Sequence, residues 1–237
     1  MPGKTFLLWL QLGNGNPAPI VLPQRCPGER LPEFIAEETS MLSSRTRILL
    51  AACAWAVVVR VAYFVAARLE LVDVMSIWGS IWAVAPLGAT VLFGGARVSN
   101  RWLALGLPLV ALLVTNLVIG LVMGNLEFYS FYRDQGLVVL GYVLMAALGA
   151  TLPERASLER LAATALVAEL VFFLVTNFGF WAVTDTYPHT AGGLWTSYMM
   201  GLPFLVRGLL GMAFYSTVLF GAQVLAERPA RIPATNA

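Results

Sequence analysis

Residues 158–183 read LERLAATALVAELVFFLVTNFGFWAV, and this stretch decides the fold class. After Glu159 and Arg160, its only charged side chain is Glu169. A bilayer is crossed by roughly 20 predominantly apolar residues, so a run of this length can cross with some tilt. We therefore predict a transmembrane helix from about Leu158 to Val183.

The whole chain has the composition of a membrane protein. Of its 237 residues, 59% are hydrophobic and 12% are charged, and the mean hydropathy is +0.76. Soluble domains carry about 25% charged residues, so we expect the bilayer to be the solvent for most of this surface. We expect a multi-pass protein of the bacterial inner (cytoplasmic) membrane, in contact with lipid. No basic run is interleaved with aromatic residues, so a nucleic-acid partner is not expected.

Five further apolar segments have lengths close to the roughly 20 residues that a crossing requires. They cover residues 48–66, 77–96, 102–123, 136–152 and 206–225. The expected fold class is therefore all-α: a polytopic bundle of six transmembrane helices in residues 45–226.

The arginines orient these segments, because cytoplasmic loops are enriched in Lys and Arg. One set of connections carries Arg45, Arg47, Arg97, Arg101, Arg155, Arg160, Arg228 and Arg231. The opposite connections carry Arg68 and Arg133, each accompanied by acidic residues. We therefore expect both termini in the cytoplasm, with residues 227–237 as a short cytoplasmic tail.

Residues 1–44 read differently from the rest of the chain. They are rich in proline and turn-forming residues and have no helical periodicity. The apolar run at residues 6–10 lacks the small-residue cleavage site of a signal peptide. Met41 begins a segment, MLSSRTR, typical of a cytoplasmic start before a first span. We expect residues 1–44 to be a disordered tail or a mis-annotated extension.

The segment Ala191–Phe204 does not fit the count of six. It is apolar but short, and it contains Gly192, Gly193 and Pro203. We interpret it as an interfacial or re-entrant helix on the external side. A seventh span is the alternative, and it would place Arg228 and Arg231 outside.

Polar side chains at membrane depth are the first candidates for a site, because each is costly unless it is paired. Glu169 lies near the middle of its span, and Thr176 and Asn177 lie about 10–12 Å nearer the outer surface. Asn116, in the third span, and Arg60, in the first, lie at comparable outer depths.

Arg60 is a natural partner for Glu169, and we treat that ion pair as a hypothesis. In the alternative, Arg60 snorkels to the outer headgroups and Glu169 is protonated against a hydroxyl.

Aromatic residues and the single histidine gather around the outer interface: Trp181, Tyr187, His189, Trp195 and Tyr198. Membrane proteins anchor such residues at the headgroups. A pocket for a planar ligand is the alternative. His189 has no second histidine or carboxylate cluster for a metal site, and a turn histidine is the simpler interpretation.

The sequence has none of the motifs GxxxxGK[ST], HExxH or GxSxG. Cys26 and Cys53 fit no redox or metal spacing. We therefore expect neither an enzyme nor a cofactor.

Two stretches of the sequence carry a family resemblance. One extends from Phe172-Phe173-Leu174-Val175-Thr176-Asn177-Phe178-Gly179-Phe180-Trp181 through Tyr187-Pro188-His189-Thr190 to Leu202-Pro203-Phe204, and the other runs from Pro86 to Ala96. Over residues 48–222 the chain resembles a bacterial membrane family of unknown function whose members are labelled as transport proteins. Arg60 falls where the family tends to carry an arginine, whereas Glu169 departs from the family's usual small residue.

That family in turn resembles the six-helix substrate-binding subunits of energy-coupling-factor vitamin transporters. The resemblance implies import of a vitamin-like small molecule, with an energising ATPase and coupling subunits as partners. The residues expected to bind the substrate are Asn177, Thr176, Trp181, Tyr187, His189, Tyr198, Asn116, Arg60 and Glu169. The alternative function is a non-transporting scaffold that docks cell-envelope partners, as rod-shape-determining membrane proteins do.

Overall fold

The computed structural model describes residues 6–11, 17–22, 33–72 and 86–227, with side chains from residue 44 onward. The chain divides into two compact units, Met1–Ser40 and Met41–Ala237. Helix α1 (Glu33–Arg68) begins in the first unit and continues into the second.

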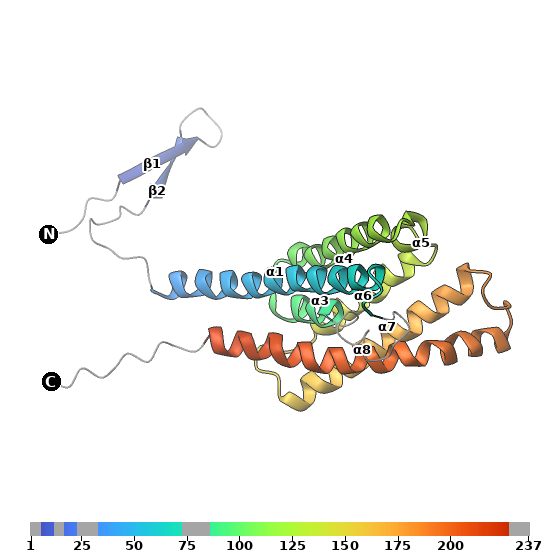
Figure 1. Ribbon diagram of the computed structural model, residues 1–237. Helices are drawn as coiled ribbons and strands as arrows, with labels where there is room; N and C mark the ends of the chain where they lie inside the picture. Colours follow the sequence, from blue (N-terminus) through green and yellow to red (C-terminus); the bar gives the residue numbers. More distant parts are fainter. Residues whose placement is uncertain (1–5, 12–16, 23–32, 73–85, 228–237) are drawn as a thin grey trace. The chain divides into compact units, whose positions relative to one another are not determined.

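The first unit contains an antiparallel hairpin of β1 (Phe6–Gln11) and β2 (Pro17–Leu22), visible in blue in Figure 1. Its register pairs Phe6 with Leu22 and Gln11 with Pro17. Two strands therefore lie in the segment that the sequence predicted to be an irregular tail.

Every regular element described in Met41–Ala237 is a helix, as the all-α prediction requires. After α1 come α3 (Pro86–Arg97), α4 (Arg101–Met123), α5 (Leu126–Ser130), α6 (Gln135–Gly149), α7 (Leu158–Val183) and α8 (Ala191–Ala226). Of the predicted second span, residues 77–85 lie outside the described residues, and the remainder forms α3.

Side-chain caps fix where three of these helices begin. The Asn100 Oδ1 accepts hydrogen bonds from the amides of Trp102 and Leu103 at the start of α4. Ser157 and Thr190 cap α7 and α8 in the same way. Each cap satisfies amide groups that have no partner within their own helix.

Helix α3 is the most enclosed of the described helices, and it packs against α4, α6, α7 and α8. Phe93 and Leu92 are fully buried in the main hydrophobic core. Two adjacent glycines allow the close approach of its neighbours: a Cβ at Gly94 would overlap the Ala104 carbonyl of α4, and one at Gly95 would overlap the Ala146 carbonyl of α6. Small residues in a membrane helix permit this close contact between helices.

Four described helical segments are long and apolar enough to cross a membrane, and three of them are the complete helices α4, α7 and α8. The fourth is Ser44–Arg68 within α1. The bounds of α7 match the predicted 158–183 span. Helix α6 has 15 residues, and the described part of α3 has 12, so neither reaches the length of a full span.

The interpretation of Ala191–Phe204 as a separate interfacial or re-entrant helix is wrong. These residues form the first part of α8, a continuous helix of 36 residues that contains Pro203. Membrane helices tolerate an internal proline because neighbouring groups satisfy the freed carbonyl. At about 1.5 Å per residue α8 is roughly 54 Å long, more than the 40–45 Å of a whole bilayer, so part of it extends beyond the hydrocarbon or the helix tilts.

Candidate functional site

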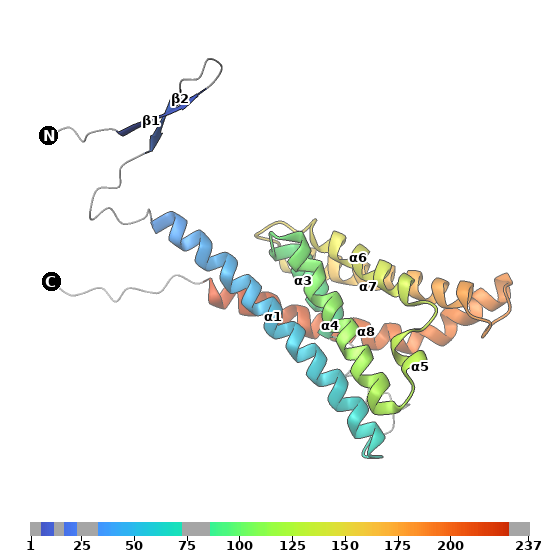
Figure 2. The ribbon, with the colours of Figure 1, turned by 90° about the horizontal axis from the view of Figure 1, so that it is seen from above.

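The candidate site lies along the contact between α7 and α8, which run side by side to the loop that joins them (Figure 2). Small residues of α8 allow this contact. A Cβ at Gly201 would overlap the Asn177 side chain, and the Ser197 hydroxyl donates to the Asn177 carbonyl over 3.0 Å. Near the start of α8, Gly193 packs on the Pro188 carbonyl of the loop. Of the two glycines that suggested a broken helix, Gly193 therefore serves packing against the loop.

A cavity of about 430 Å³ opens between the two helices at the end nearest the loop. It is lined by Asp134, Thr176, Asn177, Phe180, Tyr187, Ser197, Met200, Gly201 and Phe204. Three predicted site residues, Thr176, Asn177 and Tyr187, therefore meet in one place. Its size falls within the range of small-molecule pockets.

The polar groups of this cavity are held by the helix backbone. Thr176 Oγ1 donates to the Phe172 carbonyl over 2.8 Å, and Asn177 Nδ2 donates to the Phe173 carbonyl over 2.9 Å. The threonine therefore offers a ligand only acceptor lone pairs, while the asparagine retains one N–H and its carbonyl oxygen. These fixed orientations are a source of specificity in a binding pocket.

A second cavity, of about 600 Å³, shares Asp134 and Phe180 with the first. Its lining also includes Glu127, Phe128, Phe131 and Tyr132, so it combines acids with aromatic rings. Burial raises the pKa of the Asp134 carboxyl above its ordinary value. Asp134 is a site residue that the sequence analysis had considered only as a loop acid.

Three other predicted residues make contacts that order the α7–α8 region. Trp181 Nε1 donates to the Pro188 carbonyl over 3.0 Å, and its ring meets the His189 ring edge-on at 5.6 Å. The His189 Nε2 lies 3.2 Å from the Thr184 carbonyl. Tyr198 donates its hydroxyl to the Leu174 carbonyl over 3.1 Å. Within the described residues, no group of three or more His, Cys, Asp and Glu side chains could hold a metal ion.

Arg60 of α1 and Asn116 of α4 both lie near the phenol of Tyr132, a residue of the loop before α6. Burial raises the pKa of Tyr132, and Asn116 and Arg60 oppose that shift. The Asn116 Nδ2 is buried and has no hydrogen-bond partner among the residues described. The predicted Arg60–Glu169 ion pair is not formed, since the ion pairs of the described chain do not include it.

The carboxyl of Glu169 instead lies between α3 and α8. A Cβ at Gly208 would overlap its Oε1, and its Oε2 lies 3.7 Å from the place of a Cβ on Gly88. Met145 and Met212 approach the same point of Gly88. Glu169 is only 9% exposed, and this environment is apolar.

Arg207 is a buried cation that the sequence analysis overlooked. It is 8% exposed, and its Nε is buried with no hydrogen-bond partner in the part of the chain that the structure describes. Its guanidinium carbon lies 5.3 Å from the centre of the Phe204 ring, which lines the first cavity. The rule that selected Glu169, an ionisable residue inside a span, would also have found Arg207.

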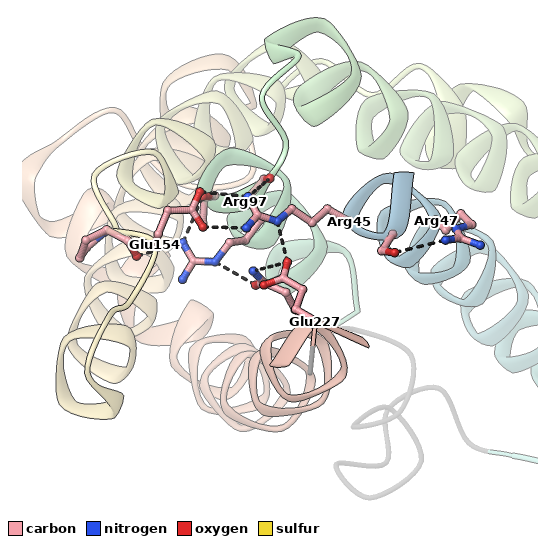
Figure 3. A network of polar contacts seen from close by, with 9 residues as sticks. Arg45, Arg47, Arg97, Glu154 and Glu227 are labelled. Carbon is pink, nitrogen blue, oxygen red and sulfur yellow. Dashed lines mark hydrogen bonds and ion pairs between the residues drawn. The ribbon is translucent and has the colours of Figure 1, made fainter. Parts of the chain in front are cut away.

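A polar network closes the opposite end of the bundle (Figure 3). Arg45 binds Glu154 through both terminal nitrogens, at 2.8 and 3.0 Å, and Glu227 through Nε at 2.8 Å. Arg97 donates to Gln223 over 2.9 Å and to the Pro153 carbonyl over 3.1 Å. The network links α1, α3, the loop before α7 and the end of α8.

Comparisons with known proteins give one family match. Residues 41–235 match the Family of unknown function (DUF6580). No curated protein and no solved structure matches the chain, so the resemblance to energy-coupling-factor subunits has no support. The prediction of a domain-of-unknown-function family is confirmed, and the chain belongs to the family DUF6580.

Proposed function

We propose that this protein is a membrane-embedded subunit that binds a small molecule from the external side for import. The cavity between α7 and α8 carries the proposal, because it brings Thr176, Asn177 and Tyr187 together with Asp134. These residues come from α7 and from two loops, so only the folded bundle assembles them. The proposed role makes and breaks no covalent bonds.

We further propose six crossings with both termini in the cytoplasm of a bacterial inner membrane. Four of the proposed crossings are the apolar part of α1, α4, α7 and α8. The other two are a second segment that ends with α3, and α6, whose 15 residues make it shorter than a typical span. The arginine-rich network of Arg45 and Arg97 supports this orientation, because cytoplasmic connections are enriched in Lys and Arg. The cavity, at the loop end of α7, then faces outward.

The chain has no nucleotide-binding motif. An ATP-driven import cycle therefore requires a separate ATPase and coupling subunits, which we propose as partners. Co-purification of such subunits from the native membrane is the direct measurement of this association.

A ligand that binds only the folded state raises its stability, which gives the test. The purified protein is heated in detergent with a panel of water-soluble vitamins and their precursors. We expect one compound to raise the unfolding midpoint of the wild type and to have a smaller effect on Thr176→Val.

Thr164→Val is the matched control. Thr164 lies in the same helix and makes the same bond to the carbonyl four residues back, also at 2.8 Å, but it does not line the cavity. An equal loss of the ligand effect in both variants would contradict the proposed site. No effect of any compound on the wild type, with tight co-purification of cell-envelope proteins, would instead support the scaffold alternative.

A further inference from the structure

A buried arginine with no hydrogen-bond acceptor in the described chain packs on one residue of the outer cavity. Arg207 is one helical turn from Phe204 in α8, and its guanidinium stacks on that ring at 5.3 Å. Helical side chains point toward the N-terminus of their helix, which for α8 is the end that holds the cavity. The guanidinium therefore lies behind the ring of Phe204, a residue that lines the 430 Å³ cavity, although Arg207 itself is not part of that lining.

The arginine has no acceptor of its own. A guanidinium carries five N–H donors, and a buried charge is retained at a large cost unless those donors are paired. No hydrogen bond or ion pair of Arg207 occurs in the described chain, and its Nε is fully enclosed. The nearest acid along the contact, Glu169, is turned onto Gly208. An acceptor supplied from outside the protein would complete the site.

We propose that the ligand of this cavity is a small organic monoanion whose carboxylate binds Arg207. A carboxylate matches the fork of the guanidinium, which can bind it through two parallel hydrogen bonds. Phe180, Tyr187 and Phe204 line the cavity and cover the apolar body of the ligand. Asp134, in the same lining, repels negative charge, so we expect a dicarboxylate to bind less tightly than a monocarboxylate. This inference rests on the proposed function and specifies its substrate class.

The experiment uses carboxylates beside their neutral carboxamides: benzoate with benzamide, nicotinate with nicotinamide, and hexanoate with hexanamide. Succinate serves as the dianion. Unfolding midpoints in detergent are measured for the wild type, for Arg207→Gln and for the control Arg68→Gln, an exposed arginine at the end of α1. We expect at least one carboxylate to bind the wild type and the control at least tenfold more tightly than its amide. In Arg207→Gln we expect that preference to disappear, with affinity reduced about 10- to 100-fold.

A measurement without ligand distinguishes a binding arginine from a structural one. Because the Nε is buried without an acceptor, Arg207→Met should raise the midpoint of the empty protein by at least about 2 °C. A lower midpoint would show that Arg207 is paired within the fold and would overturn the inference.

Two other results separate this inference from the proposed function. Amides that bind as tightly as the acids, with no change in Arg207→Gln, would refute the anion assignment and leave the binding function standing. If neither this panel nor the vitamin panel changes the midpoint, the proposed function fails, and the inference fails with it.

Discussion

Arg45 binds two carboxylates, and comparing them tests how exposure controls the strength of an ion pair. The geometry favours Glu154, which receives two hydrogen bonds from the guanidinium, at 2.8 and 3.0 Å. Burial favours Glu227, whose side chain is 20% exposed against 64% for Glu154. Water screens the exposed pair, so we expect burial to outweigh geometry.

The magnitudes follow from these environments. An exposed ion pair contributes about 0.2–1 kcal/mol, whereas a partly buried hydrogen bond to a charged group contributes about 1.5–3 kcal/mol. We therefore expect Glu227→Gln to reduce the free energy of unfolding by about 1.5–3 kcal/mol and Glu154→Gln by less than about 1 kcal/mol. Double-mutant cycles with Arg45→Gln isolate each coupling energy.

The assay is equilibrium unfolding in mixed detergent micelles, followed by circular dichroism. Arg155→Gln is the control, because Arg155 lies beside Glu154 in the same loop, is exposed and has no ion pair in the described chain. A coupling of Arg45 to Glu154 equal to or larger than its coupling to Glu227 would refute the reasoning.

The same pair predicts the pH dependence of stability. Burial acts to raise the pKa of Glu227, but hydrogen bonds from Arg45 and Gln223 outweigh it, so the pKa in the folded protein lies below its ordinary value of 4.5. The folded state therefore binds this proton less tightly than the unfolded state. Its stabilisation is present above about pH 4.5 and is lost as the pH falls through the lower, folded value. Wild-type stability should fall more steeply than that of Glu227→Gln in acid, and parallel curves would contradict the assignment.

Three further predictions concern helix packing and capping, each measured as a change in the free energy of unfolding. Gly208→Ala places a Cβ on the Glu169 carboxyl, so we expect a loss of about 1–3 kcal/mol that disappears in a Glu169→Ala background. An equal loss of stability in the wild-type and Glu169→Ala backgrounds would show that the new Cβ overlaps a group other than the Glu169 carboxyl. Asn100→Ala removes the cap of α4 and should lower the free energy of unfolding by about 0.5–2 kcal/mol. Asn100→Asp keeps a capping oxygen and should retain most of that stability. Trp181→Phe removes the bond to the Pro188 carbonyl and should cost about 0.5–1.5 kcal/mol; an unchanged stability would show that the loop does not depend on this bond.

The sequence predicted the parts of the fold that local chemistry determines. The bounds of α7 follow from Ser157, whose side chain caps its first turn, and from the end of the apolar run at Val183. The arginine spacing indicated which ends lie together, and Arg45 and Arg97 do meet at one end. Thr176 and Asn177 were selected because they are polar groups on one helix, and both line the cavity.

What the sequence did not reveal depends on contacts between distant residues. Arg45 lies 109 residues from Glu154 and 182 residues from Glu227, so no local pattern indicates their pairing. The glycines of Ala191–Phe204 looked like helix breakers because their partners, the Pro188 carbonyl and the Asn177 side chain, belong to other elements. The Arg60–Glu169 hypothesis was wrong for a similar reason: comparable depth in the bilayer does not fix which face of a helix meets which neighbour.

The two charges on the α7–α8 contact are kept apart by the packing around them. Glu169 lies against Gly208, while Arg207, the adjacent residue, is turned to the ring of Phe204. An internal ion pair at this depth would reduce the cost of burying either charge alone, so a fold selected only for stability would favour one. The separation is consistent with the proposed function, because an arginine paired with Glu169 would have fewer donors for a carboxylate ligand.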